Sequence, residues 1–114
     1  MTRFARSFAH ALRGIRYAFS GRNFRVQAII ALAVLGLSCY LRISPDEWLA
    51  VIFAIGLVLS MEATNTAVEE ICNKFHPETH PHIALIKDLA AGAVLIASLA
   101  ALAIGLVVFL PYIS

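Results

Sequence analysis

The sequence predicts an all-α integral membrane protein with three transmembrane helices and an amphipathic surface helix at its N-terminus. Of the 114 residues, 61% are hydrophobic and only 14% are charged, which is too apolar for an ordinary soluble domain of this size. Three apolar stretches are each long enough to cross a hydrocarbon core of about 30 Å. We therefore expect a single membrane domain that spans residues 1–114.

The charged residues are distributed unevenly along the chain. Six of the nine Lys and Arg residues precede Val26, and no acidic residue precedes Asp46. Cytoplasmic segments of membrane proteins carry an excess of Lys and Arg, so we expect a cytoplasmic N-terminus. No motif that reads RNA or DNA accompanies the basic residues, and we expect no nucleic acid partner.

Residues 3–19 are expected to form a helix that lies on the membrane surface. The basic residues and His10 share one helical face, and the opposite face gathers the apolar residues Phe4, Phe8, Ala11, Leu12, Ile15 and Phe19. The stretch 20–23 then breaks the pattern and turns the chain into the bilayer.

The three spans are expected at residues 24–43, 46–73 and 83–112. Ser44 is expected to cap the second span, with Pro45 at its first position and Trp48 as an interfacial anchor. The prolines of the stretch 74–82 cannot continue a helix, so this stretch is expected to be a loop.

The third span carries a seam of small residues that favours close helix packing, at Ala93, Ala97, Ala101 and Gly105. Three spans alone make a thin bundle around a polar site. We therefore expect a homo-oligomer.

A polar stripe interrupts the second span. Offsets of three, four, seven and eleven residues return to the same helical face, so one face carries Glu62, Asn65, Thr66, Glu69 and Asn73. A charged residue at bilayer depth costs about 2.5–3.5 kcal/mol on insertion scales, so an ordered polar stripe indicates a functional site. Counting from Trp48 at about 1.5 Å per residue, the stripe lies at the cytoplasmic interface.

The two carboxylates of this stripe suit two different tasks. Glu62 and Glu69 are about 10 Å apart along the helix, which is too far to share one proton. Glu62 lies deeper and suits a general base, whereas Glu69 is closer to water and suits a hydrated Mg²⁺ ion. Lys87 supplies a positive charge of the kind that phosphate oxygens need during phosphoryl transfer. The chain has no P-loop or protein-kinase motif, so nucleotide use cannot be derived from those fingerprints.

These residues resemble the signature of the small integral-membrane diacylglycerol kinases and undecaprenol kinases of prokaryotes. The resemblance rests on EATNTAVE at 62–69 and on KDLAAGAVL at 87–95, with His80 between them, and it extends over nearly the whole chain. It implies a homotrimer of three-span subunits in the bacterial inner membrane. Each subunit would transfer the γ-phosphate of Mg-ATP to the hydroxyl group of a membrane lipid alcohol.

The resemblance also implies individual roles. Glu62 resembles the catalytic base, Asn65 a neighbour that positions the reacting groups, and Glu69 a ligand of the metal bound to ATP. Lys87 and Asp88 resemble the family's nucleotide and phosphate contacts. Glu78 and His80 fall where the family's cytoplasmic loop touches the nucleotide, and Arg3 resembles a basic nucleotide contact near the N-terminus. The NTA and AAGAVL stretches are more similar to the undecaprenol kinase branch than to the diacylglycerol kinase branch.

The chain departs from the family pattern at two positions. The family often has a glutamate that shares metal binding with the equivalent of Glu69, and this chain has Gly21 in that place. Asn23, Glu70 or a water molecule are the alternatives for the missing ligand. The family's usual basic residue two positions before Lys87 is replaced by leucine.

Two functions of other classes also fit the residues. A small proton-coupled exporter would need a carboxylate near the middle of the membrane but not Lys87. A non-catalytic membrane adaptor would bind anionic lipid through its basic surface helix and would not need Glu62.

Overall fold

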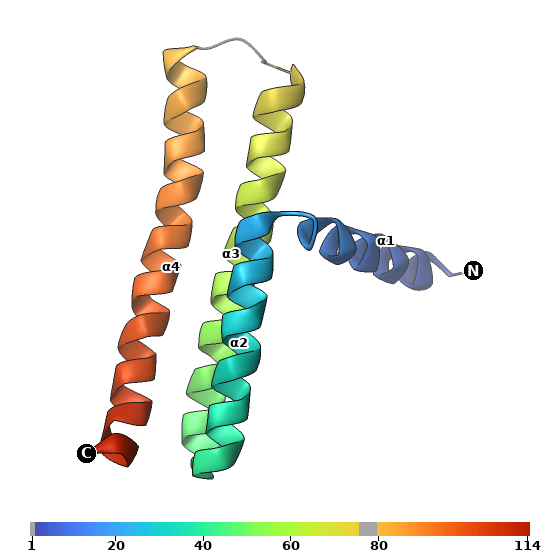
Figure 1. The fold of residues 1–114 in the computed structure, drawn as a ribbon. Coiled ribbons are helices and arrows are strands. Elements are labelled where there is room, and N and C mark those ends of the chain that lie inside the picture. Colours follow the sequence, from blue (N-terminus) through green and yellow to red (C-terminus); the bar gives the residue numbers. More distant parts are fainter. Residues whose placement is uncertain (1, 76–79) are drawn as a thin grey trace.

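The computed structural model describes residues 2–75 and 80–114, and these residues form four α-helices without strands. The helices are α1 (Arg3–Ala18), α2 (Arg22–Leu41), α3 (Pro45–Phe75) and α4 (Pro81–Ile113). Figure 1 shows α2, α3 and α4 side by side, with α1 projecting from them at a wide angle. Each of the three long helices is apolar enough to cross a membrane. The predicted all-α class with three spans and an N-terminal surface helix is confirmed.

The helix α1 begins at a side-chain cap and keeps its apolar face uncovered. The Thr2 hydroxyl accepts a hydrogen bond of 3.1 Å from the Ala5 N–H. Large side chains on its apolar face remain more than half exposed, at Phe4, Phe8, Leu12 and Ile15. An amphipathic helix with an uncovered apolar face is suited to lie in the interface of a bilayer.

The turn between α1 and α2 is shorter than the sequence predicts. The helix α1 ends at Ala18 and Gly21 is already the N-cap of α2, so Arg22 and Asn23 belong to the helix and not to a break at 20–23. This short turn brings the end of α1 beside the start of α2.

The start of α3 carries the predicted cap. The Ser44 N–H donates to Glu47 Oε1 at 2.9 Å, and the Glu47 N–H donates to Ser44 Oγ at 3.2 Å. This reciprocal pair satisfies two N–H groups that the first helical turn leaves free. The Tyr112 hydroxyl also donates to the Glu47 carboxylate and so joins the end of α4 to the start of α3.

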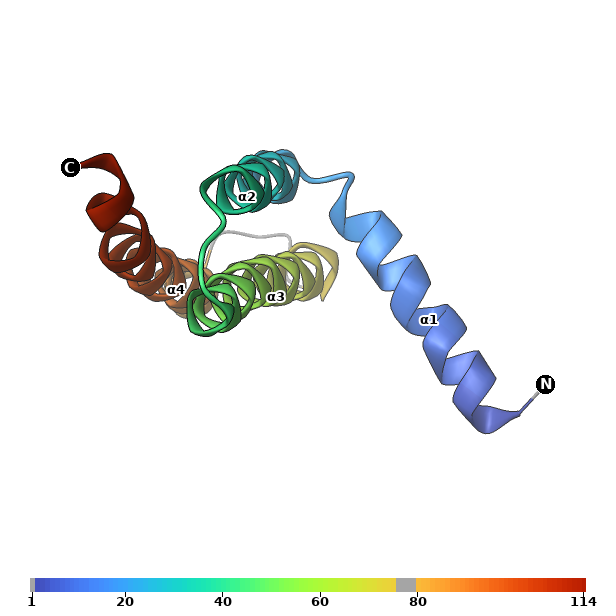
Figure 2. The same cartoon turned by 90° about the horizontal axis from the view of Figure 1, so that it is seen from below.

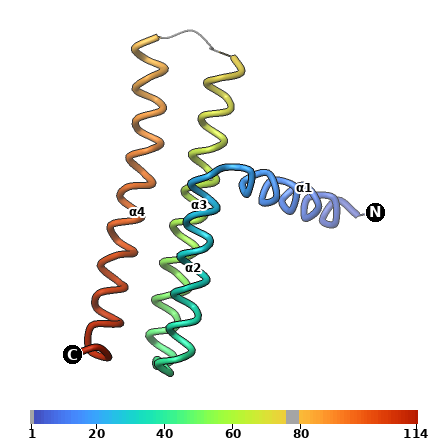
Figure 3. The backbone as a smooth tube through the Cα atoms, viewed as in Figure 1, coloured from blue at the N-terminus to red at the C-terminus, as the bar shows by residue number. Residues whose placement is uncertain are grey.

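The second and third spans are longer than predicted at the other end of the bundle. The helix α3 continues to Phe75 and α4 begins at Pro81, so the expected loop at 74–82 was too long. Proline is tolerated in the first turn of a helix because its missing N–H would have no partner there. The His80 ring accepts a hydrogen bond of 3.0 Å from the His82 N–H and caps α4. Figure 3 shows α3 and α4 continuing together past the level at which α1 leaves the bundle.

The bundle is thin, with α3 between α2 and α4. Figure 2 shows this order along the bundle axis, with α1 and α4 on opposite sides of α3. A small buried apolar cluster near the α2–α3 turn comprises Ile43, Val51 and Val108. In the seam of small residues, Ala97 is only 3% exposed. Large apolar side chains such as Leu32, Phe53 and Ile96 point outwards on the three spans, where lipid or another subunit can cover them.

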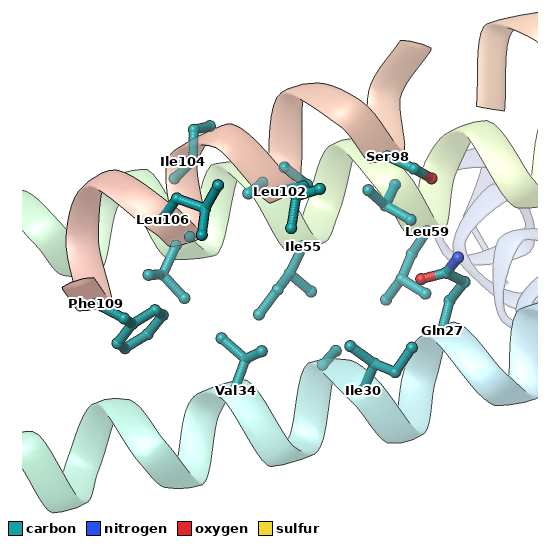
Figure 4. A pocket seen from close by; sticks show the side chains of 16 residues that line it. Gln27, Ile30, Val34, Ile55, Leu59, Ser98, Leu102, Ile104, Leu106 and Phe109 are labelled. Atoms are coloured by element: carbon teal, nitrogen blue, oxygen red, sulfur yellow. The ribbon is translucent and has the colours of Figure 1, made fainter. Parts of the chain in front are cut away.

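An apolar groove of about 320 Å³ runs between α2, α3 and α4. Figure 4 shows Ile30, Val34, Ile55 and Leu102 lining it, with the polar side chains of Gln27 and Ser98 towards one end. Gln27 is one helical turn after Asn23, so the polar end of the groove is the end nearer the start of α2.

Candidate active site

A polar cleft of about 270 Å³ lies between the start of α2 and the last third of α3. The turn and α2 contribute Gly21, Arg22, Asn23 and Phe24, and α3 contributes Glu62, Asn65, Thr66, Glu69, Glu70 and Asn73. All five residues of the predicted polar stripe therefore line one cleft. Figure 1 shows that α1 leaves the bundle at the start of α2, so the cleft lies at the level of the amphipathic helix.

Glu62 is the deepest charged group of this cleft. It is 5% exposed and is the one charged residue that is buried in the described part of the chain. Thr66 Oγ1 donates to the Glu62 backbone carbonyl at 3.1 Å, but no described residue donates a hydrogen bond to the Glu62 carboxylate. The Glu62 carboxylate is therefore available to a ligand of the cleft that it lines.

Asn65 is oriented by its neighbour one turn further along α3. Its Nδ2 donates to Glu69 Oε1 at 2.8 Å. Its Oδ1 is fully buried and has no hydrogen-bond partner among the described residues. The carbonyl oxygen of this amide is therefore free to accept a hydrogen bond from a ligand or to contact a cation.

Lys87 brings a positive charge to the rim of the cleft. Its Nζ donates to Asn73 Oδ1 at 2.7 Å, which links the first turns of α4 to the last turns of α3. Asn73 itself lines the cleft. The contact ties a cation of α4 to the polar stripe of α3 through an amide, which leaves its positive charge unpaired by a carboxylate among the described residues.

A contact that the sequence did not indicate joins α1 to the cleft. The Tyr17 hydroxyl donates to Glu70 Oε1 at 2.7 Å, across 53 positions in the sequence. This hydrogen bond, together with the negative charge of Glu70, raises the pKa of Tyr17 above its usual value. The sequence predicts Glu70 only as an alternative metal ligand and gives no signal for Tyr17, because no local pattern pairs residues on separate helices.

The remaining predicted site residues that the structure describes do not line the cleft. Arg3 is at the end of α1 that lies away from the bundle, as Figure 2 shows. His80 caps α4, and Asp88 is exposed next to Lys87. Glu78 lies outside the described residues. Nucleotide contacts by these four residues therefore stay predictions.

Gly21 contributes backbone but no side chain to the cleft. A Cβ at this position would meet the Ala18 carbonyl oxygen at 3.4 Å, an ordinary contact, so the backbone here accepts a Cβ. As a result, the carboxylates that line the cleft among the described residues all come from α3, at Glu62, Glu69 and Glu70.

The donor atoms of the cleft fit Mg²⁺ bound together with a nucleotide. In the described part of the chain, no group of three or more His, Cys, Asp or Glu residues could hold a metal ion by itself. Mg²⁺ is usually held by one or two carboxylates, with the remaining ligands from water and substrate phosphates. The carboxylates of Glu69 and Glu70 and the free Oδ1 of Asn65 are hard oxygen donors of this kind.

Comparison with known proteins identifies the family. Residues 9–109 match the sequence profile of a family described as prokaryotic diacylglycerol kinase. The chain belongs to this family. The predicted resemblance is thereby confirmed, and the protein is a multi-pass membrane lipid kinase, a phosphotransferase with an alcohol group as acceptor. Family membership favours the kinase over the exporter and the adaptor.

Three relatives of the prokaryotic diacylglycerol kinase family are similar along most of the chain. The undecaprenol kinase of Bacillus subtilis (strain 168) is 39% identical over 112 residues, which cover 97% of this chain and 91% of that protein. The diacylglycerol kinase of Synechocystis sp. is 35% identical, covering 92% of this chain and 61% of that protein. The diacylglycerol kinase of Escherichia coli (strain K12) is 27% identical, covering 88% and 83% respectively.

Proposed function

We propose that this lipid kinase transfers the γ-phosphate of Mg-ATP to the hydroxyl group of undecaprenol or a related membrane lipid alcohol. The observation that carries the proposal is the buried Glu62 carboxylate, which has no hydrogen-bond partner among the described residues and lines a polar cleft beside an amphipathic helix. A base at this depth can meet the hydroxyl group of a lipid, while the exposed Glu69 can meet a phosphate group from water.

Three observations support a polyprenol over diacylglycerol as the acceptor. The chain is 39% identical to an undecaprenol kinase, against 35% and 27% for two diacylglycerol kinases. The NTA and AAGAVL stretches point to the same branch. The apolar groove between the spans could receive part of a long hydrocarbon chain below the polar cleft.

The transfer step assigns one task to each side chain. Glu62 takes the proton of the lipid hydroxyl while the oxygen of that hydroxyl forms a bond to the γ-phosphorus. The bond between this phosphorus and the β–γ bridging oxygen breaks, and ADP leaves with that oxygen. Asn65 orients the reacting groups, and Lys87 offsets the negative charge that develops on the phosphoryl oxygens.

The metal and nucleotide contacts complete the proposed site. Glu69 would hold Mg²⁺, which neutralises phosphate charge when it is bound. Arg3, Glu78, His80 and Asp88 would contact the nucleotide, as their positions in the family motif imply.

We further propose that the chain is a single kinase domain in the bacterial inner membrane, with a cytoplasmic N-terminus, and that it works as a homotrimer. The cluster of basic residues on α1 supports the orientation. The thin bundle and its outward apolar side chains support assembly with further subunits.

Phosphate transfer to defined lipids tests the proposed function. The purified protein in bicelles would receive Mg²⁺ and γ-labelled ATP together with undecaprenol, a dolichol-like alcohol or diacylglycerol in separate reactions. We expect label in the lipid phase, most of it with undecaprenol. Absence of labelled lipid with every alcohol, in a sample whose oligomer is intact, would contradict the proposed function. A preference for diacylglycerol would overturn the assignment of the acceptor alone.

A further inference from the structure

The acidic groups of the cleft are arranged asymmetrically. The three carboxylates that line it in the described part of the chain lie on α3, and the opposite wall has Gly21 at the start of α2, without a side chain. A metal ion with a nucleotide often uses two carboxylates. Among the described residues of one chain, a second carboxylate in this cleft comes from α3 as well.

Glu69 and Glu70 are both oriented by a hydrogen bond at one oxygen only. Asn65 donates to Oε1 of Glu69, and Tyr17 donates to Oε1 of Glu70. Among the described residues, none donates a hydrogen bond to the second oxygen of either carboxylate. A carboxylate that is fixed through one oxygen presents the other in a defined direction, as outer hydrogen bonds do for metal ligands generally.

Two further polar groups of this helix lack a hydrogen-bond partner among the described residues. Glu62 is 5% exposed and lines the cleft, and its carboxylate has no hydrogen-bond partner in the described part of the chain. Asn65 Oδ1 is fully buried and is also without a partner there. These groups lie on the same face of α3 as Glu69 and need either a donor or a cation.

We propose that Glu70 is the second carboxylate of the Mg-nucleotide site, beside Glu69, and that Tyr17 of α1 is the positioning residue that orients it. This inference rests on the proposed use of Mg-ATP. It makes the surface helix part of the metal site, because α1 reaches the site through the Tyr17 hydroxyl.

The competing explanation is that Glu70 serves only to anchor α1 on α3. Glu70→Gln separates the two roles, because glutamine still offers an oxygen to the Tyr17 hydroxyl but removes the charge. Glu47→Gln is the matched control: Glu47 is also an α3 glutamate that accepts a hydrogen bond from a tyrosine, Tyr112, and it lies at the opposite end of the helix.

Binding of Mn²⁺ in the presence of a non-hydrolysable ATP analogue, followed by electron paramagnetic resonance, gives a readout that is independent of lipid phosphorylation. We expect Glu70→Gln to weaken Mn²⁺ binding by about tenfold or more, and Tyr17→Phe, which removes the hydrogen bond that orients this carboxylate, to weaken it as well. Glu47→Gln should bind like the wild type.

A carboxylate placed on the opposite wall provides a second test. Gly21→Glu in the Glu70→Gln background should restore most of the lost Mn²⁺ affinity, because Gly21 lines the same cleft and its backbone accepts a Cβ. A residue that only anchors α1 would not be replaced in this way. The rescue also shows that the Glu70→Gln protein is folded.

Wild-type affinity in Glu70→Gln, alongside loss in Glu69→Gln, would overturn the inference and leave Glu70 as an anchor. Loss in Glu70→Gln without rescue by Gly21→Glu would overturn it as well. A different result would contradict the proposed function. In that case the wild type would bind Mn²⁺ with the analogue and yet transfer no phosphate from ATP to any lipid alcohol.

Discussion

Glu62 and Glu69 lie on one face of α3 but in different surroundings. Glu62 is buried, whereas Glu69 is exposed and accepts a hydrogen bond from Asn65. A carboxylate with little access to water suits proton transfer from a lipid hydroxyl, and one in contact with water suits a hydrated cation. Removal of the charge should therefore impair proton transfer at Glu62 and cation binding at Glu69.

For Glu69→Gln we expect a weaker affinity for Mg-ATP, with a raised KM for Mg-ATP as the main kinetic effect. Glutamine can still accept the hydrogen bond from Asn65, so the loss would report on the charge. Isothermal titration with a non-hydrolysable analogue, with and without Mg²⁺, measures this directly. Unchanged affinity in the presence of Mg²⁺ would remove Glu69 from the metal site.

For Lys87→Gln we expect kcat/KM to fall by about 10²- to 10³-fold, the range typical for loss of one group that stabilises transition-state charge. Glutamine can keep a hydrogen bond to Asn73, so the link between α3 and α4 should persist. Steady-state kinetics with varied ATP tests this expectation. A change of less than threefold would show that Lys87 is an interfacial anchor and no part of the reaction.

Helical periodicity predicts the polar stripe but not its partners. The offsets along one helix place Glu62, Asn65 and Glu69 together, and all of them line the cleft. The contacts of Tyr17 with Glu70 and of Lys87 with Asn73 join separate helices, and their geometry depends on packing that no single stretch of sequence encodes. The place of Glu70 in the cleft follows from the structure alone.

The helices themselves are predictable because hydrophobic runs and caps are local. The residues at which the helices begin and end are less predictable. Pro81 stops a helix in its interior but is favoured in the first turn, and the sequence does not show which of the two applies. The helix α1 was predicted from its two faces, since amphipathicity needs no tertiary information.

The capping pair at the start of α3 contributes to stability at a distance from the polar cleft. Ser44→Ala removes the hydroxyl that accepts from the Glu47 N–H, and such substitutions typically cost about 1 kcal/mol. We expect a lower midpoint of thermal unfolding in detergent, with unchanged kcat at low temperature. An equal midpoint for the wild type and Ser44→Ala would show that the stability of α3 does not depend on this cap.

The molecule as a whole exposes more apolar surface than three helices can bury among themselves. Arg3 and His80 do not line the cleft of their own chain. We expect native mass spectrometry from mild detergent to give a trimer, because further subunits would cover the outward faces of the spans. A monomer that transfers phosphate at the full rate would contradict the proposed assembly.

The central claim is that the α3 cleft performs the phosphoryl transfer with Glu62 as the base. The most direct measurement is a single-turnover reaction of Glu62→Gln with γ-labelled Mg-ATP and undecaprenol, with nucleotide affinity measured on the same sample. The account predicts that transfer to lipid falls by at least about 10²-fold, as expected for loss of a general base, while affinity for Mg-ATP stays within about twofold. Transfer at the wild-type rate, or loss of transfer together with an equal loss of nucleotide binding, would contradict it.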